Sequence, residues 1–380
     1  MKVLLIDQIA KVNYKYTYPL ANGLSKAKVD VELVIDQKKE NENSLQKKYH
    51  YFITSDKQTG KIRKIYNYIS SYFRIGKILK KGDYDVLHTE WYILSPVDYL
   101  FIKIFKAKYG VKYIATVHDI LPFNEKFYDM KYHGKLYDLA DSIILQAPIN
   151  MQRFAELFPN DKNKTLLIPH GHMLDYVEYF DNFKARDILN IPEDKTVFLF
   201  FGQIKKVKGV DILLKAILEL KKERDDFFVV IAGNVWKADF RECQEIIDNN
   251  NLTNVLYTDI RYIPDEEIKY FYSAADVCVL PYTDVYQSGV IQLAYGYKKA
   301  VISSNLPAFT QFVHDEETGY TFQNKNVNDL KEKMLLCLNN KDKLSQFGEN
   351  GYDLVKNKLN WDNLAKEIIE KAYKNTNNCQ

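Results

Sequence analysis

Two groups of residues in the second half of the sequence could bind a diphosphate. Lys205 and Lys208 follow Gly202 in a loop after an apolar, strand-like run. Their ammonium groups could stabilise negative charge on a phosphate, and the glycine lets a ligand approach the backbone. Ser288 and Gly289 begin an apolar segment of helical length, and the first turn of a helix offers free N–H groups. A solvated basic loop and an ordinary capped turn are the alternatives.

Both groups need a parallel sheet to bring them to one edge. Short apolar runs alternate with amphipathic segments along the whole sequence, which is the pattern of α/β proteins. Ligands bind at the carboxyl ends of the strands in such sheets. The expected strands are 2–6, 31–35, 86–89, 112–117, 142–145, 165–168, 196–201, 228–232, 254–257, 277–280, 300–303 and 320–322.

The strand series restarts near the middle of the chain, which predicts two domains. A chain of 380 residues is long for a single core. We expect an N-terminal domain at 1–175, an irregular linker at 176–195 and a C-terminal domain at 196–358. A cleft between two such domains is a favoured place for a substrate.

Composition and charge narrow the function classes. The net charge of +3 and the lack of a reader motif argue against nucleic-acid binding. The four cysteines form no CxxC pair, so neither a disulfide framework nor a zinc site is expected. The N-terminal apolar run ends at Asp7, too early for a signal peptide, and no apolar stretch is long enough to span a bilayer. We expect a cytoplasmic protein.

The stretch 57–81 is rich in Lys and Arg and contains no acidic residue. It predicts an amphipathic helix over 62–79. Its basic side could contact an anionic membrane, so the protein could lie at the inner face of the membrane. The alternative is a surface helix that packs its apolar face on the sheet. The apolar side consists of Ile62, Ile65, Tyr66, Ile69, Tyr72, Phe73 and Leu79.

Several motifs, taken in order, resemble those of family 4 retaining glycosyltransferases. The run 202–216 fits the pattern GxIxxxKGxxxLLxA, which is similar to a segment of that family. Ser288-Gly289-Val290 resembles a variant of the family's donor loop, and Thr116-Val117-His118-Asp119 resembles its TxHD segment. Further similar segments are 168–171, 228–234, 263–267, 272–276 and 318–320.

The resemblance implies a GT-B fold, in which two Rossmann-like domains with parallel sheets face a central cleft. The last helix, 359–380 with Trp361, would cross back to the N-terminal domain. The implied reaction is metal-independent transfer of a hexose-type sugar from a nucleotide-diphosphate sugar, with retained configuration. UDP is favoured over GDP. The acceptor would be a glycan, glycolipid or glycoprotein in surface polysaccharide synthesis. No cofactor is expected.

The resemblance also implies roles for individual residues. The expected catalytic residues are His118, Lys205, Lys208 and Asp284. The expected donor-binding residues are Gly202, Gln203, Asn234, Arg261, Ile263, Ser288, Gly289, Val290 and Ile291. The expected acceptor-binding residues are Tyr14, Lys15, Glu90 and Trp91, where core packing is the favoured alternative for Trp91. No metal ligand is expected.

Three departures from the family pattern bear on activity. Gln203 stands where many members have Arg, although Lys205 follows two positions later. The positions of the family's Glu-x7-Glu pair hold Tyr286 and Ala294. The first loop, 8–15, lacks the usual Gly-Gly. Two alternatives therefore stay open: a catalytically inactive GT-B subunit that binds a partner, and a GT-B epimerase acting on a UDP-sugar.

Overall fold

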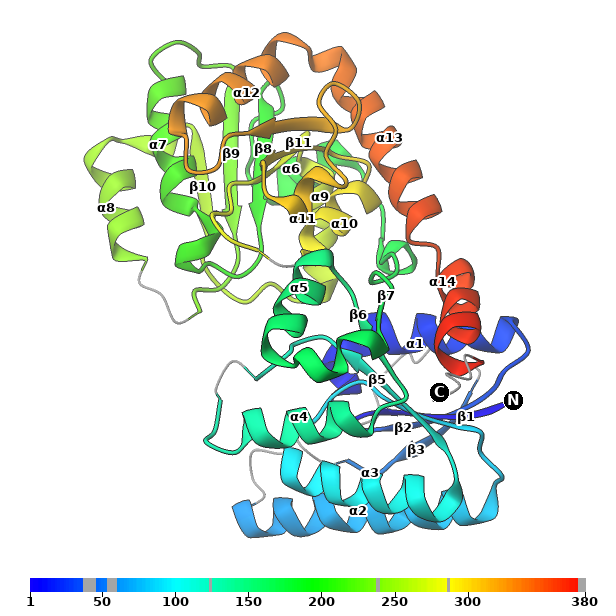
Figure 1. Cartoon of the computed structure of the whole chain (residues 1–380). Helices are drawn as coiled ribbons and strands as arrows, with labels where there is room; N and C mark the ends of the chain where they lie inside the picture. The colour runs from blue at the N-terminus through cyan, green and yellow to red at the C-terminus, as the bar shows by residue number, and fades with distance from the viewer. Residues whose placement is uncertain (37–45, 53–59, 123–124, 237–239, 286–287, 375–380) are drawn as a thin grey trace. The chain divides into compact units, whose positions relative to one another are not determined.

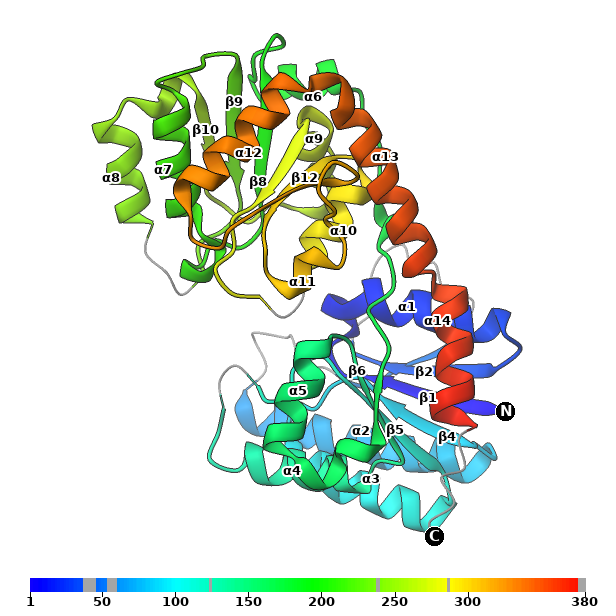
Figure 2. The same cartoon turned by 45° about the horizontal axis from the view of Figure 1, so that its top comes forward.

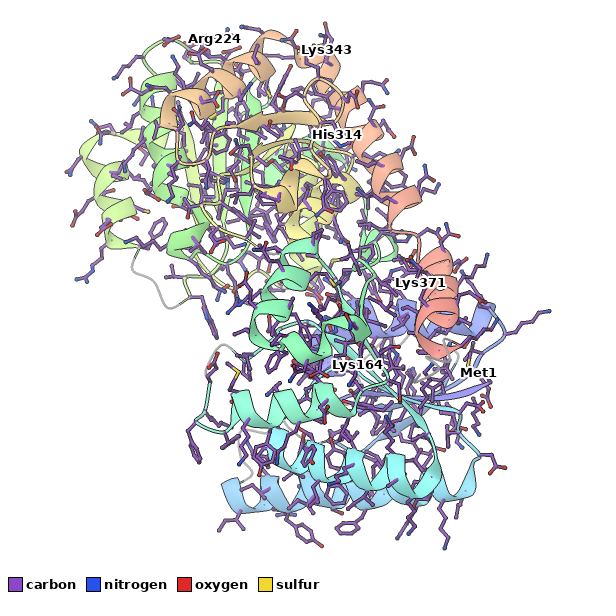
Figure 3. All side chains as sticks on the ribbon, in the orientation of Figure 1. Met1, Lys164, Arg224, His314, Lys343 and Lys371 are labelled. Atoms are coloured by element: carbon purple, nitrogen blue, oxygen red, sulfur yellow. The ribbon has the colours of Figure 1, made fainter. Side chains whose placement is uncertain are left out.

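The protein was analysed as a computed structural model, which describes residues 1–36, 46–52, 60–122, 125–236, 240–285 and 288–374. The chain forms two compact units. Unit 1 comprises Met1–Gly171 together with Leu359–Gln380, and unit 2 comprises His172–Lys358. Each unit contains one parallel sheet between layers of helices, and side chains fill the space between sheet and helices (Figure 3).

Unit 1 has a seven-stranded sheet in the order β3-β2-β1-β4-β5-β6-β7, in which all neighbours are parallel (Figure 1). Its strands are β1 (Lys2–Asp7), β2 (Asp30–Ile35), β3 (Lys47–His50), β4 (Val86–Thr89), β5 (Lys112–Val117), β6 (Ser142–Leu145) and β7 (Thr165–Leu167). Its helices are α1 (Ala10–Lys26), α2 (Lys61–Lys81), α3 (Ser95–Tyr109), α4 (Asp129–Leu139), α5 (Pro148–Leu157) and α14 (Trp361–Ile368), and α14 continues as a π-helical turn, Ile369–Tyr373.

The two faces of this sheet carry separate cores because successive side chains of a strand point in opposite directions. Leu4 and Ile6 of β1 join a core with α2 to α5, whereas Val3 and Leu5 join a core with α1 and α14. The last helix therefore completes unit 1: α14 packs on α1, and the Tyr373 hydroxyl lies 2.7 Å from Nδ1 of the buried His88 (Figure 2).

Unit 2 has a six-stranded sheet in the order β10-β9-β8-β11-β12-β13, again with parallel neighbours. Its strands are β8 (Thr196–Phe201), β9 (Phe227–Ala232), β10 (Leu256–Asp259), β11 (Val277–Leu280), β12 (Ala300–Ser304) and β13 (Gly319–Phe322). Its helices are α6 (Asn182–Ile188), α7 (Val210–Leu220), α8 (Arg241–Asn249), α9 (Ile268–Ala274), α10 (Gly289–Gly296), α11 (Pro307–Thr310), α12 (Val327–Asn339) and α13 (Lys341–Lys358). The prediction of two Rossmann-like domains is confirmed.

Three segments differ from the sequence-based expectation. The expected first loop, 8–15, is mostly helix, because α1 begins at Ala10 and the Asp7 carboxylate accepts hydrogen bonds from Ile9 N, Asn13 Nδ2 and Thr17 Oγ1. A polar edge strand, β3, was not expected, and it is held by parallel pairing with β2. The expected linker, 176–195, contains α6, and Arg186 of α6 pairs with Asp276 at 2.8 Å.

Helix α2 has a buried apolar face, an exposed apolar face and a basic face, whereas the sequence predicts one apolar and one basic face. Tyr68, Tyr72, Ile75 and Leu79 pack in the core, as the surface-helix alternative requires. The expected apolar face does not pack as a whole, since Ile62 is 86% exposed, Ile65 50%, Tyr66 70% and Phe73 63%. These four residues lie 80–180° around the helix from Arg74, and Arg63, Lys77 and Lys81 form a basic strip beside them, within about 60° of Arg74. In the described ranges, no helix combines the length and apolarity needed to cross a bilayer.

The packing of α13 predicts that one glycine-to-alanine substitution in this helix lowers the stability of unit 2. Gly-to-Ala in a helix interior normally stabilises by about 1 kcal/mol. A Cβ at Gly348, however, would lie 1.9 Å from the backbone carbonyl oxygen of Lys298, just after α10. A backbone atom cannot rotate away, so we expect Gly348→Ala to destabilise unit 2 by about 1–3 kcal/mol. The exposed substitution Asn357→Ala on the same helix is the control and should be neutral or slightly stabilising. Urea unfolding measures both, and stabilisation by Gly348→Ala would contradict this packing.

Candidate functional site

The candidate site in unit 2 is built on the carboxyl ends of β8 and β9. Gly202 follows β8 with φ +117°, and Gly233 follows β9 with φ +145°. A Cβ at Gly233 would lie 1.9 Å from the Gly202 carbonyl oxygen, so this close approach requires a glycine. The next residues of the two loops also pair, because Ile204 N donates to Asn234 O at 2.9 Å. The two loops therefore form one rigid edge.

Lys208 is fixed by a second glycine contact. Gly209 begins α7 with φ +67°, and a Cβ there would lie 1.9 Å from the Pro281 carbonyl oxygen at the end of β11. Thr283 N donates to Val207 O at 2.8 Å, which joins the same two loops. As a result Lys208 Nζ lies 3.6 Å from the centre of the buried Tyr282 ring.

The ring of Tyr282 lets the Lys208 ammonium stay charged in a mostly buried place, because a cation is attracted to the face of an aromatic ring. Burial, with a smaller contribution from the charge of Lys205, lowers the pKa of Lys208 to about 8. The sequence analysis missed Tyr282. Its position directly after the proline that ends β11 was the available signal.

The first turn of α10 lies beside this lysine loop. A Cβ at Gly202 would be 3.5 Å from Val290 Cγ2, so the β8 loop faces this turn directly. Ser288 precedes the helix without capping it through its side chain. The N–H groups of Gly289 to Ile291 have no partner inside the helix, as in any first helical turn. Of the two positions of the missing Glu pair, Ala294 is buried in α10 and Tyr286 lies outside the described residues.

The remaining residues predicted in unit 2 are placed around this centre. Gln203 and Asp284 are exposed on the loops after β8 and β11. Arg261 follows β10, where its guanidinium pairs with Asp259 at 2.9 Å and with Glu267. Ile263 is buried. The structure thus brings Gly202 against the first turn of α10 and Lys208 onto the Tyr282 ring, and it places Arg261 and Ile263 after the edge strand of the same sheet.

Unit 1 carries a second cluster at the carboxyl ends of β4 and β5. His118 Nε2 lies 2.7 Å from Glu90 Oε2, and the other carboxylate oxygen lies 3.7 Å from Nε2 of His88. The His118 ring stacks on Trp91 at 4.9 Å and meets the edge of Tyr16 at 4.7 Å. Trp91 is half-buried and packs on His118. This position is compatible both with the expected role in acceptor binding and with the alternative of core packing.

Burial decides the charge of this cluster. It lowers the pKa of His118 to about 4, against the opposing charges of Asp7 and Asp119, and it raises the pKa of Glu90 well above the usual range. The favoured state is therefore uncharged, with the Glu90 carboxylic acid donating to His118 Nε2. Glu90 is only 1% exposed and contacts His118, whereas the expected acceptor contact needs an accessible side chain. Tyr14 and Lys15 lie half-buried on α1, with Lys15 Nζ 5.5 Å from the Tyr14 ring.

The arrangement of the side chains that could bind a metal ion is the last feature of the site. In the part of the chain that the structure describes, no group of three or more His, Cys, Asp or Glu side chains is arranged to hold a metal ion.

Comparison with known families and relatives identifies the family of this fold. A family described as "Glycosyltransferase Family 4" matches residues 15–176, and one described as "Glycosyl transferases group 1" matches residues 181–354. The chain is 21% identical to D-inositol 3-phosphate glycosyltransferase 2 of Catenulispora acidiphila, over 75% of this chain and 70% of that protein. It is 22% identical to spore coat protein SA of Bacillus subtilis, over 79% and 81%.

Solved structures agree with these matches. A glycosyltransferase from Rickettsia africae superimposes with a TM-score of 0.75 at 18% identity, covering 98% of this chain and 97% of that one. The Anabaena protein HepE, solved in complex with UDP and glucose, gives 0.71 at 16% identity, covering 97% and 98%. Likeness at this level of identity shows the fold. The chain belongs to the family 4 glycosyltransferases and has their GT-B fold of two Rossmann-like domains with parallel sheets.

Proposed function

We propose that the protein is a retaining, metal-independent transferase that moves a hexose-type sugar from a nucleotide-diphosphate sugar to a glycan or lipid-linked acceptor. The observation that carries this proposal is the Lys208 ammonium held on the Tyr282 ring beside the first turn of α10. UDP is the favoured nucleotide, since HepE was solved with UDP-glucose as well as with UDP. The acceptor class, a precursor of surface polysaccharide, rests on the family resemblance.

The proposed chemistry follows from the charges. When the sugar leaves its diphosphate, the transition state is oxocarbenium-like and negative charge grows on the leaving phosphate. Lys208, Lys205 and the N–H groups of Gly289 to Ile291 stabilise that charge. The acceptor hydroxyl attacks the anomeric carbon from the face that the diphosphate leaves and gives its proton to the departing phosphate oxygen, so the configuration is retained. The uncharged His118, whose Nε2 accepts from Glu90, carries its proton on Nδ1 and can donate a hydrogen bond to a sugar hydroxyl without adding a competing charge.

The donor site is tested by removing one charge. Lys208→Ala should lower sugar transfer by 10²-fold or more, about 2.7 kcal/mol, because its charge acts on the transition state. Lys205→Ala should cost less. The exposed neighbour Lys206 in the same turn is the matched control, and Lys206→Ala should leave transfer unchanged. Transfer of radiolabelled sugar measures all three, and full turnover by folded Lys208→Ala would contradict the site. An inactive subunit would transfer no sugar even as wild type, and an epimerase would release a free epimer.

The lowered pKa of Lys208 predicts a basic limb in the pH profile. The catalytic form is the cation, which is lost as pH rises through about 8 in the free enzyme. Therefore kcat/KM should fall above pH 8, while kcat should fall later, because bound diphosphate favours the charged lysine. Lys208→Arg keeps its charge throughout this range and should flatten the limb, even with lower activity. If the wild-type enzyme and Lys208→Arg showed the same basic limb in kcat/KM, the limb would belong to another titrating group.

We further propose peripheral binding to an anionic membrane through α2, which would place the enzyme at the cytoplasmic face near lipid-linked acceptors. Ile62, Ile65, Tyr66 and Phe73 would enter the lipid interface, and the basic strip beside them would meet the headgroups. Each Lys or Arg near such a surface contributes about 1 kcal/mol, which salt screens.

A flotation assay with anionic vesicles tests this contact. Arg63, Lys64, Arg74 and Lys77 changed together to Gln should weaken binding by several kcal/mol at low salt and leave donor hydrolysis intact. The control changes four exposed lysines of unit 2 to Gln, namely Lys184, Lys325, Lys343 and Lys356, and so removes the same charge. Wild-type protein that ignores the vesicles would point to a soluble glycan or protein acceptor.

A further inference from the structure

A second basic site lies in unit 1, and it includes Arg74 and Lys77 of the basic strip on α2. A groove of about 460 Å³ runs between β3, the start of β1 and the second half of α2. Lys2 begins β1, Lys47 begins β3 and Tyr84 precedes β4. The groove therefore starts at the amino ends of β1 and β4 and runs along the short strand β3 to Tyr51, whereas Glu90 and His118 follow the carboxyl ends of β4 and β5.

One wall of the groove is a row of cations on α2. Arg74, Lys77 and Lys81 are three and four residues apart, so they lie on one face of the helix and line the groove together. Within the described ranges, no carboxylate pairs with any of the three. Arg74 lies over the ring of Tyr51, with its guanidinium carbon 5.6 Å from the ring centre. Three cations that face one groove without a carboxylate partner among the described residues leave a local excess of positive charge.

The opposite wall does not cancel that excess. Glu32 is the acidic residue among the groove's lining, and its carboxylate already has four donors. The hydroxyls of Tyr49 and Tyr84 donate to it at 2.8 and 2.6 Å, and Lys2 and Lys47 lie 3.2 and 3.6 Å from it. These contacts hold Glu32 ionised although burial opposes that state, so they lower its pKa. Lys2 also lies 3.8 Å from Asp30, so the two lysines and two carboxylates of this wall balance, and Arg74, Lys77 and Lys81 leave the groove a net charge of about +3.

We propose that this groove binds a phosphate-bearing ligand with at least two negative charges. Phosphate suits it because the planar guanidinium of Arg74 offers paired donors to phosphate oxygens, while Lys77 and Lys81 supply point charges. The volume lies in the range of small-molecule sites and exceeds what one phosphate fills. The rings of Tyr49, Tyr51 and Tyr84 provide a surface for a sugar or polyol attached to the phosphate. The phosphate belongs either to a soluble molecule or to a lipid headgroup.

The test uses radiolabelled inorganic pyrophosphate as the probe. Because the proposed donor site also binds diphosphate, binding is measured in a Lys205→Ala/Lys208→Ala background, which removes both lysines of that site. Arg74→Gln/Lys77→Gln/Lys81→Gln should weaken pyrophosphate binding at least tenfold. The matched control, Arg63→Gln/Lys64→Gln/Lys80→Gln, removes the same charge from the same helix at positions outside the groove and should change binding less than twofold.

Several outcomes would overturn the proposal. Equal weakening by both triple variants would show that only diffuse charge acts, and no weakening by either would show that the groove does not bind phosphate. Citrate binding as tight as pyrophosphate would exclude selection for phosphate. All substituted side chains are exposed or half-buried, and a thermal melt confirms that each variant folds. Sugar transfer by the otherwise wild-type enzyme is assayed separately, so failure of the donor-site proposal leaves this result interpretable.

The two sources of phosphate are separated with vesicles that contain phosphatidylglycerol. If a lipid headgroup occupies the groove, the groove variant floats less than the control variant and pyrophosphate displaces the wild-type protein. If the ligand is soluble, the groove variant loses pyrophosphate binding but floats like the control. Both results support a phosphate site and assign its source.

Discussion

The close approach of two backbones at Gly209 and Pro281 is the constraint on which the candidate donor site depends. No side chain fits between α7 and the end of β11 at this point, since a Cβ would lie 1.9 Å from the carbonyl oxygen. The contact sets the position of Lys208 relative to Tyr282 before any ligand arrives. A charge that is already in place costs no reorganisation when negative charge develops, which is why preorganised groups contribute strongly to catalysis. The partly buried lysine tolerates this position because an aromatic face replaces part of its lost hydration.

The side chains at the carboxyl ends of the strands are charged in unit 2 and uncharged in unit 1. In unit 2, a cation is kept near the surface of a loop, with a pKa lowered but still close to neutral pH. In unit 1, Glu90, His118 and His88 are buried together, and desolvation removes their charges. A cation suits a diphosphate, whereas an uncharged cluster can exchange hydrogen bonds with neutral hydroxyl groups.

Much of this arrangement was accessible from the sequence, and the exceptions have physical reasons. The ranges expected for Val86–Thr89, Lys112–Val117 and Val277–Leu280 coincide with the observed strands, because buried parallel strands are continuous apolar runs. β3 was missed because its sequence, KKYH, is polar, and pairing with β2 alone decides its structure. The exposed ridge of α2 was missed because helical periodicity shows which residues share a face but not which face has a neighbour. Tyr282 was missed because the contact with Lys208 joins two loops far apart in the chain.

The placement of Tyr373 has a consequence for the order in which the chain folds during synthesis. Unit 1 begins at the first residue, yet one partner of the buried His88 and the layer that covers α1 come from α14 and the turn after it. Unit 2, which is continuous in sequence, lies between them. At about 5–20 residues per second, the ribosome needs about 10–40 s to make the intervening roughly 200 residues. During that interval the apolar face of α1 is uncovered, so the domain made first is the one completed last.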